Sequence, residues 1–316
     1  MAPLLVCPRC ACRLVEASGA YRCSSPSCHC APGGFPTIGH WPVLVDFEHS
    51  VLQRDALETS SASGIARDCA PRTPLIERLP RRLRGWWKPH NQVAERKIEV
   101  LLSLLSDTSP LVVVVGGATI GNGIDAIYID PRIRVLGFDI RGSPITQFIG
   151  DAHEIPLADG SVDALVVQAV LEHVLHPEQV VAEIHRVLRD DGLVYAETPF
   201  LQQVHAGAYD FVRFTASGHR YLFRAFDELD AGPVAGPGTQ LLWSIDHLVR
   251  GLTRSDSAGR AVRAGLGWLR RLDRWVPRAY AMDNASAYFF LGRRSLTELT
   301  PHEVVEYYQG AQGNRL

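Results

Sequence analysis

The chain has 316 residues, 46% of them hydrophobic, which is enough to bury a large core in about two domains. Its formal net charge of −2 at pH 7 gives no overall attraction to nucleic acid or to an anionic membrane. The sequence has no run of about 18 apolar residues and no basic segment before an apolar start, so we expect neither a transmembrane nor a secreted protein.

The cysteines predict a metal site near the start of the chain. Six of the seven lie within the first thirty residues and form two knuckles on either side of a predicted hairpin. Paired thiolates of this spacing suit a tetrahedral zinc ion, and the metal would supply folding energy that so small a core lacks. The clustering also favours a reducing, cytoplasmic location over disulfides. The predicted zinc ligands are Cys7, Cys10, Cys23 and Cys28.

Three further candidate ligands are left over: Cys12, His29 and Cys30. The last of them could replace Cys28, and reduced structural thiols without a metal remain an alternative. Residues 4–47, which include the stretch Phe35–Val45, resemble the zinc-ribbon family related to the activator subunit of tRNA and protein methyltransferases. The resemblance implies a structural or docking element, through which a protein partner or a second copy could bind. We assign residues 1–50 to this domain.

Residues 51–90 form the predicted linker, since residues 55–75 are rich in Ser, Ala, Pro and Arg and lack apolar periodicity. The linker ends in the basic stretch Arg78–Lys88, which contains Trp86 and Trp87. This stretch could contact phosphates and stack on bases, but a solvated stretch whose tryptophans cover the core is the favoured interpretation. A helix is predicted next, from a cap at Asn91 to about residue 106.

A nucleoside site is predicted where a buried strand runs into glycines. The strand is Leu111–Val115, and the glycines are Gly116, Gly117, Gly121 and Gly123. Glycine lets backbone approach a ligand closely. Asp139 ends the next apolar run, about 20 residues on, where a carboxylate can accept hydrogen bonds from a ribose. The glycines do not fit G-x-G-x-x-G, which disfavours a dinucleotide, and an ordinary α/β turn remains an alternative.

Strands and helices alternate after Asp139. Strands are predicted at residues 147–151, 162–167 and 192–196, with a helix at Glu178–Leu188 between the last two. This order predicts an α/β fold with a parallel, doubly wound sheet. Ligands bind beyond the carboxyl ends of such strands. Five candidate positions converge there: Gly117, Asp139, Asp151, Gln168 and Glu197.

Three motifs, Gly150–Asp163, Gln168–Val174 and Glu183–Gly192, closely resemble class I S-adenosylmethionine-dependent methyltransferases of the type 11 kind. The likeness spans about residues 95–230 and implies a seven-stranded, mostly parallel Rossmann-like sheet with S-adenosylmethionine as cofactor. It also implies the cofactor contacts: Gly116, Gly117 and Gly121 under the methionine and ribose, Asp139 at the ribose, Asp151 and Ala152 at the adenine, and Gln168 beside the sulfonium.

The segment Thr198–Thr215 is dense in His, Tyr, Asp and Arg and predicts a loop over the cofactor's methyl group. His205 is the candidate general base for a hydroxyl acceptor, with Asp210 as its orienting partner and His173 as a competitor for the role. A neutral amine acceptor would need no base, and each polar residue alone could simply stabilise the loop. Similar loops occur in relatives linked with saccharide or natural-product modification.

The remaining residues should complete the sheet and add helices. A sixth strand is predicted at Phe226–Leu229 and a seventh, antiparallel by resemblance, at Ser286–Gly292. Between them lies a helical insertion, about residues 238–280, with amphipathic helices at Leu241–Leu252 and Ala258–Trp275. The insertion could line an acceptor pocket, bind a partner subunit or lie on a membrane surface. We assign residues 91–300 to the methyltransferase domain and 301–316 to a tail.

Together these features predict a cytoplasmic enzyme that transfers the methyl group of S-adenosylmethionine to an oxygen or nitrogen of a small-molecule acceptor. An RNA methyltransferase is one alternative, favoured by the zinc ribbon and the basic stretch but opposed by the net charge. A scaffold without catalysis is another. It is suggested because the family usually has an acid before the glycines, where this chain has Val114 and Val115.

Overall fold

The computed structural model describes residues 4–17, 19–30, 33–55, 57, 90–105 and 108–313. Most of the predicted linker, including the basic stretch Arg78–Lys88, lies outside these residues. The amino-terminal module begins with a two-stranded antiparallel sheet of β1 (Leu14–Ala17) and β2 (Ala20–Cys23). No helix in the described part of the chain is both long and apolar enough to cross a membrane.

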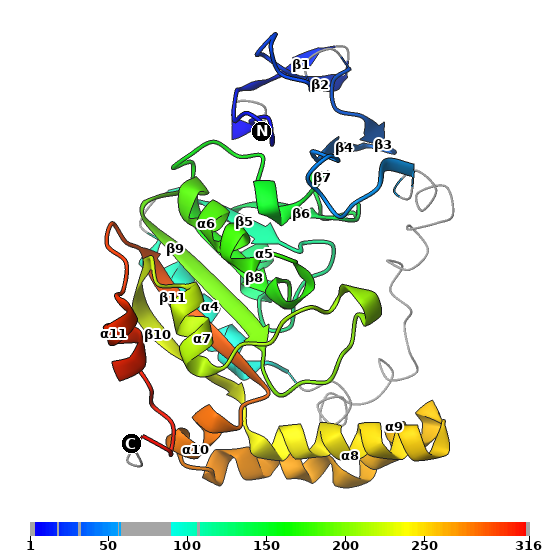
Figure 1. The fold of residues 1–316 in the computed structure, drawn as a ribbon, viewed down its shortest axis with the longest axis vertical. Coiled ribbons are helices and arrows are strands. Elements are labelled where there is room, and N and C mark those ends of the chain that lie inside the picture. The colour runs from blue at the N-terminus through cyan, green and yellow to red at the C-terminus, as the bar shows by residue number, and fades with distance from the viewer. Residues whose placement is uncertain are drawn as a thin grey trace.

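One large sheet organises the rest of the chain (Figure 1). Its strand order is β10-β11-β9-β8-β5-β6-β7-β4-β3, and pairing is parallel from β9 to β4 and antiparallel elsewhere. The strands are β3 (Thr37–Ile38), β4 (Trp41–Leu44), β5 (Leu111–Val115), β6 (Arg134–Asp139), β7 (Phe148–Gly150), β8 (Val162–Gln168), β9 (Leu188–Pro199), β10 (Phe226–Ala235) and β11 (Ala287–Arg294). The mostly parallel α/β sheet is as predicted, and β11 is antiparallel to both neighbours.

The strand count departs from the prediction, because the sheet has nine strands rather than seven. The additional two, β3 and β4, come from the amino-terminal module. Val43 and Leu44 of β4 pair in parallel with Ile149 and Gly150 of β7. An edge strand exposes unpaired N–H and C=O groups, and the buried apolar run that includes Val43 and Leu44 covers that edge. The module thus extends the large sheet.

Helices cover both faces of the sheet. In β5, which is apolar at every position, alternate side chains point to opposite faces and enter two different cores. Val113 and Val115 pack on the side of α6 (Pro177–Val187) and α7 (Ala216–Leu222). Val112 and Val114 pack on the side of α4 (Gln92–Leu104) and α5 (Asp125–Ile129). The ribbon in Figure 1 shows these two layers of helices.

The helix predicted after Asn91 is close to the observed α4. Asn91 caps α4 by accepting a hydrogen bond from the Ala94 amide at 3.0 Å. Short 3-10 turns also lie at the carboxyl edge of the sheet: η3 (Ala152–Glu154), η4 (Leu171–His173) and η5 (Gly207–Tyr209). The last helix of the described residues is α11 (Pro301–Glu306), which has a capping box between Thr300 and Glu303.

The predicted insertion forms a helical layer at one end of the molecule (Figure 1). It comprises α8 (Pro237–Thr253), α9 (Asp256–Leu266), η6 (Gly267–Trp275) and α10 (Arg278–Asp283). The single helix predicted over 258–275 is therefore wrong, since α9 ends at Leu266 and a 3-10 helix follows. Asp273 of that helix accepts hydrogen bonds from the amides of Gly238 at 2.6 Å and Thr239 at 3.2 Å, which ties η6 to the start of α8.

Candidate functional site

The glycine loop follows β5 at the carboxyl edge of the sheet. Gly116 has a φ of 73°, a left-handed conformation that a side chain would strain. Gly121 passes so close to the side chain of Gln168 that a Cβ there would overlap its Oε1. The loop and Gln168 are thus in contact, as expected for two parts of one predicted site.

Asp139 ends β6 beside this loop. Its Oδ2 accepts a hydrogen bond from the Ala118 amide at 3.1 Å, and its Oδ1 accepts one from the Arg141 amide at 3.0 Å. Burial raises the pKa of Asp139, and these backbone donors only partly oppose the rise. The carboxylate therefore holds the glycine loop, and its remaining lone pairs are those that could meet a ribose.

Asp151 follows β7 and is buried, with Ala152 buried beside it. Its Oδ1 lies 2.6 Å from Nδ1 of His153, and Ser50 of the amino-terminal module donates its hydroxyl to Oδ2. Burial acts to raise the pKa of Asp151, but these hydrogen bonds outweigh it and hold the pKa below its usual value. The amino-terminal module thus contacts a predicted cofactor residue directly.

Glu197 lies at the end of β9, next to Gln168, and is buried. It accepts hydrogen bonds from Nδ2 of Asn91 at 3.0 Å, from Nε2 of Gln168 at 2.8 Å and from the hydroxyl of Tyr195. Burial raises its pKa, although the three donors oppose that effect. Sequence reasoning noted Glu197 as a converging acid but missed both donors: the fold brings Asn91 to it, whereas the two-residue spacing of Tyr195 in β9 was a signal that could have identified that contact.

Only the nitrogen of the Gln168 side-chain amide has hydrogen-bond partners among the described residues. Its Nε2 donates to Glu197 and to the Asn122 carbonyl at 3.1 Å. Its Oε1 is buried and has no hydrogen-bond donor among the described residues. A buried acceptor without a donor is uncommon in folded proteins and indicates a missing partner. The missing donor would lie next to Gly121, where the cofactor is predicted.

A second cluster lies on the acceptor side of the same edge. His173 of η4 and His205 of the loop after β9 face each other, with their Nε2 atoms 3.1 Å apart. Glu172 Oε1 lies 3.7 Å from each of these nitrogens. Asp210 Oδ2 lies 3.4 Å from Nδ1 of His205, and Arg213 pairs with the Asp210 carboxylate. The structure thus brings together the three predicted acceptor residues.

Charge in this cluster is set by burial and by Arg213. Hydrogen bonds from Arg213 hold the pKa of Asp210 far below its usual range, so Asp210 is an anion. Burial lowers the pKa of His173 and raises the pKa of Glu172 to about 7. Sequence reasoning missed Glu172, although an acid within the apolar turn Val170–Val174 was a signal that could have identified it.

The cysteines form a compact cluster. The Sγ atoms of Cys7, Cys10, Cys23 and Cys28 all lie within 4.8 Å of one another, with 3.8 Å from Cys7 to Cys28 and 3.4 Å from Cys10 to Cys23. Sulfurs that each lie 2.3 Å from a tetrahedral zinc ion would be about 3.8 Å apart, so the spacing fits the metal. Burial raises the pKa of Cys7 to about 12, and a cation would be needed to keep that thiolate. The cluster suggests a zinc site.

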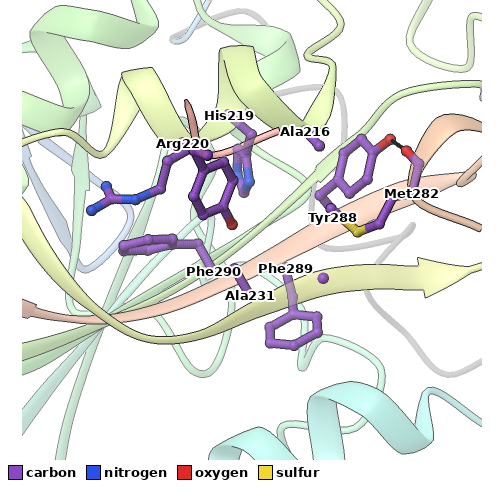
Figure 2. A pocket seen from close by; sticks show the side chains of 10 residues that line it. Ala216, His219, Arg220, Ala231, Met282, Tyr288, Phe289 and Phe290 are labelled. Carbon is purple, nitrogen blue, oxygen red and sulfur yellow. Dashed lines mark hydrogen bonds between the residues drawn. The ribbon is translucent and has the colours of Figure 1, made fainter. Parts of the chain in front are cut away.

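A small cavity lies elsewhere, between α7 and strands β10 and β11 (Figure 2). Its volume is about 10 Å³, which is space for a single water molecule. His219 and Arg220 of α7 and Tyr288 and Phe290 of β11 are among the residues that line it, as Figure 2 shows. His219 Nε2 has no hydrogen-bond partner among the described residues, and burial lowers its pKa to about 3. This cavity is too small for a nucleoside and belongs to the packing of α7.

Residues 120–196 match the family described as a methyltransferase domain. Similar curated proteins include demethylmenaquinone methyltransferase of Renibacterium salmoninarum, 38% identical over 24% of this chain and 32% of that protein. Another is a probable S-adenosylmethionine-dependent methyltransferase of Mycolicibacterium smegmatis, 31% identical over 36% of this chain and 45% of that protein. These matches support a class I S-adenosylmethionine-dependent methyltransferase. The chain spans less than half the length of these curated relatives.

Solved structures with a similar arrangement have low identity. Phosphoethanolamine N-methyltransferase 2 of Haemonchus contortus in complex with S-adenosyl-L-methionine is 13% identical, with a TM-score of 0.43 over 63% of this chain and 52% of that one. A chain of the complex between the Haloferax volcanii Trm112 methyltransferase activator and a putative methyltransferase is 16% identical, with a TM-score of 0.42 over 65% of this chain and 92% of that one.

Proposed function

We propose that this chain transfers the methyl group of S-adenosylmethionine to an oxygen or nitrogen of a small-molecule acceptor. The observation that carries the proposal is the buried Oε1 of Gln168, an acceptor without a donor, which lies against the glycine loop at Gly121. An N–H group of the cofactor's methionine part would supply the missing donor. The match of residues 120–196 to a methyltransferase domain supports the same assignment.

Glu197 could replace the acid that the family usually has before the glycines. A carboxylate is a favourable partner for the cofactor's ammonium group, because opposite charges attract more strongly in a site with little water. Val114 and Val115 cannot provide one, but Glu197 is buried and hydrogen-bonded to Gln168 at 2.8 Å. We infer that the pair of Gln168 and Glu197 takes this role. The other proposed contacts are the glycine loop, Asp139 at the ribose, and Asp151 with Ala152 at the adenine.

When bound, S-adenosylmethionine supplies an electrophilic methyl group. The chain's own task is then to align the acceptor with that group and, for a hydroxyl, to remove a proton. The cluster of His173, His205 and Asp210 is our candidate for this task. Its position supports the assignment, because η4 begins three residues after Gln168 and the Phe211 amide donates to the Glu172 carbonyl at 2.8 Å.

The amino-terminal module is proposed to hold one structural zinc ion in the four-cysteine cluster. Between two of these cysteines, Arg9 pairs with Asp46, its Nη2 lying 2.8 Å from Oδ1, so the knuckle is tied to the segment after β4. That segment continues to Ser50, the donor to Asp151. A zinc ion would therefore stabilise both the β4–β7 pairing and one wall of the proposed cofactor site.

Partners and location remain predictions. The helical insertion exposes several large apolar side chains: Leu241, Leu248, Leu252, Trp268 and Trp275. Such a surface suits a protein partner, a second copy or a membrane surface, and the zinc ribbon is the other candidate for docking. A cytoplasmic location is inferred from the cysteine pattern alone.

The function is tested by calorimetry with S-adenosylhomocysteine and by release of that product from S-adenosylmethionine in the presence of hydroxylated and amine acceptors. We expect the full chain to bind S-adenosylhomocysteine, and Gln168→Leu to weaken binding on the order of tenfold through loss of one hydrogen bond. Gln240→Leu is the matched control, since the side-chain amide of Gln240 in α8 donates to the hydroxyl of Ser244 at 2.8 Å, away from the proposed cofactor contacts. A wild-type chain that binds neither S-adenosylmethionine nor its product would refute the function.

A further inference from the structure

Three ligand atoms of different residues converge at the acceptor side. Nε2 of His173 and Nε2 of His205 are 3.1 Å apart, and Oε1 of Glu172 lies 3.7 Å from each. They come from the turn after β8 and the loop after β9. The Phe211 amide, which donates to the Glu172 carbonyl at 2.8 Å, holds the two segments together.

The tautomer of His173 follows from its other nitrogen. Nδ1 lies 2.7 Å from the carbonyl oxygen of Tyr209. A carbonyl oxygen can only accept a hydrogen bond, so Nδ1 carries the proton and donates. In the neutral ring, Nε2 therefore presents a lone pair to His205. This is the arrangement in which a second hydrogen bond orients a histidine that binds a metal.

His205 is oriented in the same way. Its Nδ1 lies 3.4 Å from Asp210 Oδ2 and 3.4 Å from the Gln203 carbonyl oxygen, and both atoms are acceptors. The proton therefore belongs on Nδ1, and Nε2 presents a second lone pair. Arg213 compensates the charge of Asp210, so the surroundings are not strongly cationic. Two lone pairs then face each other at 3.1 Å with no proton between them.

Glu172 supplies an independent indication of a ligand. Its side chain is 1% exposed, and neither carboxylate oxygen has a hydrogen-bond donor among the described residues. Burial of a carboxylate without a partner is costly. A proton shared by the two histidines would leave Glu172 unsatisfied, since its oxygen is 3.7 Å from both nitrogens. A cation would satisfy all three groups at once.

We propose that Glu172, His173 and His205 bind one divalent first-row transition-metal ion, which holds the hydroxyl group of the acceptor beside the methyl group of the cofactor. Two imidazoles and one carboxylate favour such an ion over magnesium or calcium, which prefer oxygen ligands. Three protein ligands leave coordination positions open, which suits an acceptor with two neighbouring oxygens. This proposal rests on the proposed function and narrows the acceptor atom to oxygen.

With the cation bound, His173 and His205 are its ligands and do not accept the acceptor's proton, so the chemistry balances without a protein base. The cation lowers the pKa of the bound hydroxyl, whose proton passes to water. The oxygen then forms a bond to the methyl carbon as the bond from that carbon to sulfur breaks, and the electron pair of the broken bond stays on sulfur. The products are the methyl ether, the neutral thioether and one proton. Asp210 and the Tyr209 carbonyl act only by orienting the two rings.

The test titrates Mn²⁺ into the full chain with its zinc retained, using calorimetry and the loss of the free-ion signal in electron paramagnetic resonance. We expect one Mn²⁺ site at the cluster and at least tenfold weaker binding in Glu172→Gln and in His205→Ala. S-adenosylhomocysteine affinity should stay within about twofold, because neither residue is a proposed cofactor contact. Full Mn²⁺ affinity in both variants would overturn the proposal.

A second group of residues provides the control. Asp46 and His49 of the amino-terminal module and Glu154 of η3 also bring three ligand atoms within 4.8 Å of one another. His49→Ala should leave Mn²⁺ binding at the proposed site unchanged. If His49→Ala abolishes binding while Glu172→Gln does not, the ion belongs to that other group and the proposal is wrong. If Mn²⁺ binds as expected but S-adenosylhomocysteine does not, the proposed function fails and the cation site stands.

Discussion

Replacement of Asp139 by alanine tests the cofactor site most directly. In the structure its carboxylate accepts hydrogen bonds from the amides of Ala118 and Arg141, at 3.1 and 3.0 Å. These bonds use one lone pair on each oxygen, so each oxygen retains a site for a ribose hydroxyl. Asp139→Ala therefore removes two proposed contacts with the cofactor and two contacts within the fold.

The two losses can be estimated separately. Hydrogen bonds to a charged group contribute about 1.5–3 kcal/mol, so loss of a ribose pair should cost about 2–3 kcal/mol, or roughly 30- to 150-fold in affinity. Loss of an acceptor for the two amides should lower the free energy of unfolding by about 1–2 kcal/mol, since Asp139 is only half-buried. Asp139→Asn, which keeps one acceptor oxygen, should fall between wild type and alanine.

The assay is calorimetric titration with S-adenosylhomocysteine, alongside thermal unfolding of the same samples. Asp130→Ala is a matched control, because Asp130 accepts from the Arg132 amide at 3.0 Å in the same way but precedes β6 rather than ending it. We expect the control to retain wild-type affinity. If Asp139→Ala binds as tightly as the control, Asp139 does not hold the ribose and the assignment of this strand end is wrong.

Three further predictions concern other parts of the molecule. Elemental analysis should find about one zinc per chain. Cys7→Ser should abolish zinc binding, whereas Cys12→Ser should retain it, because Cys12 lies outside the four-sulfur cluster. His205→Ala should lower turnover roughly 100- to 10,000-fold with S-adenosylhomocysteine affinity unchanged; near-full turnover would remove it from the acceptor site. The pKa of Asp151 is lower in the folded state than in the unfolded state, so its contribution to stability should be lost as pH falls below about 4, and Asp151→Asn should flatten that part of the unfolding profile.

The fold was predictable from the sequence where burial alone decides the pattern. The run Leu111–Val115 is apolar at every position, and both faces of β5 are indeed buried. The insertion was harder, because Ala258–Trp275 keeps a helical apolar pattern past the point where α9 ends at Leu266. Two glycines, Gly265 and Gly267, flank that end, and glycine stabilises a regular helix poorly.

The candidate site was predictable at positions that a parallel sheet fixes, and less so where loops meet. Asp139 and Gln168 end strands, so the sequence places them at the carboxyl edge. Asn91 contacts Glu197 only because α4 packs near the end of β9, a relation that no spacing along the chain encodes, whereas Tyr195 lies two residues before Glu197 on the same face of β9. Glu172 was missed although its apolar neighbours in Val170–Val174 indicate burial, because its partner His205 reaches it only through the loop after β9.

The amino-terminal module connects the cysteine cluster to a distant part of the large sheet through an edge strand. β7 is only three residues long, and without β4 it would be the exposed edge of the sheet. Pairing of β4 with β7 fixes the strand that leads into Asp151, and Ser50 then donates to that carboxylate. Arg9, between the first two cysteines, is paired with Asp46 just after β4. Two side-chain contacts, Arg9 with Asp46 and Ser50 with Asp151, therefore join the cysteine cluster to Asp151 through residues 46–50. If Asp151 meets the adenine as proposed, the module helps to shape that site in addition to any docking role.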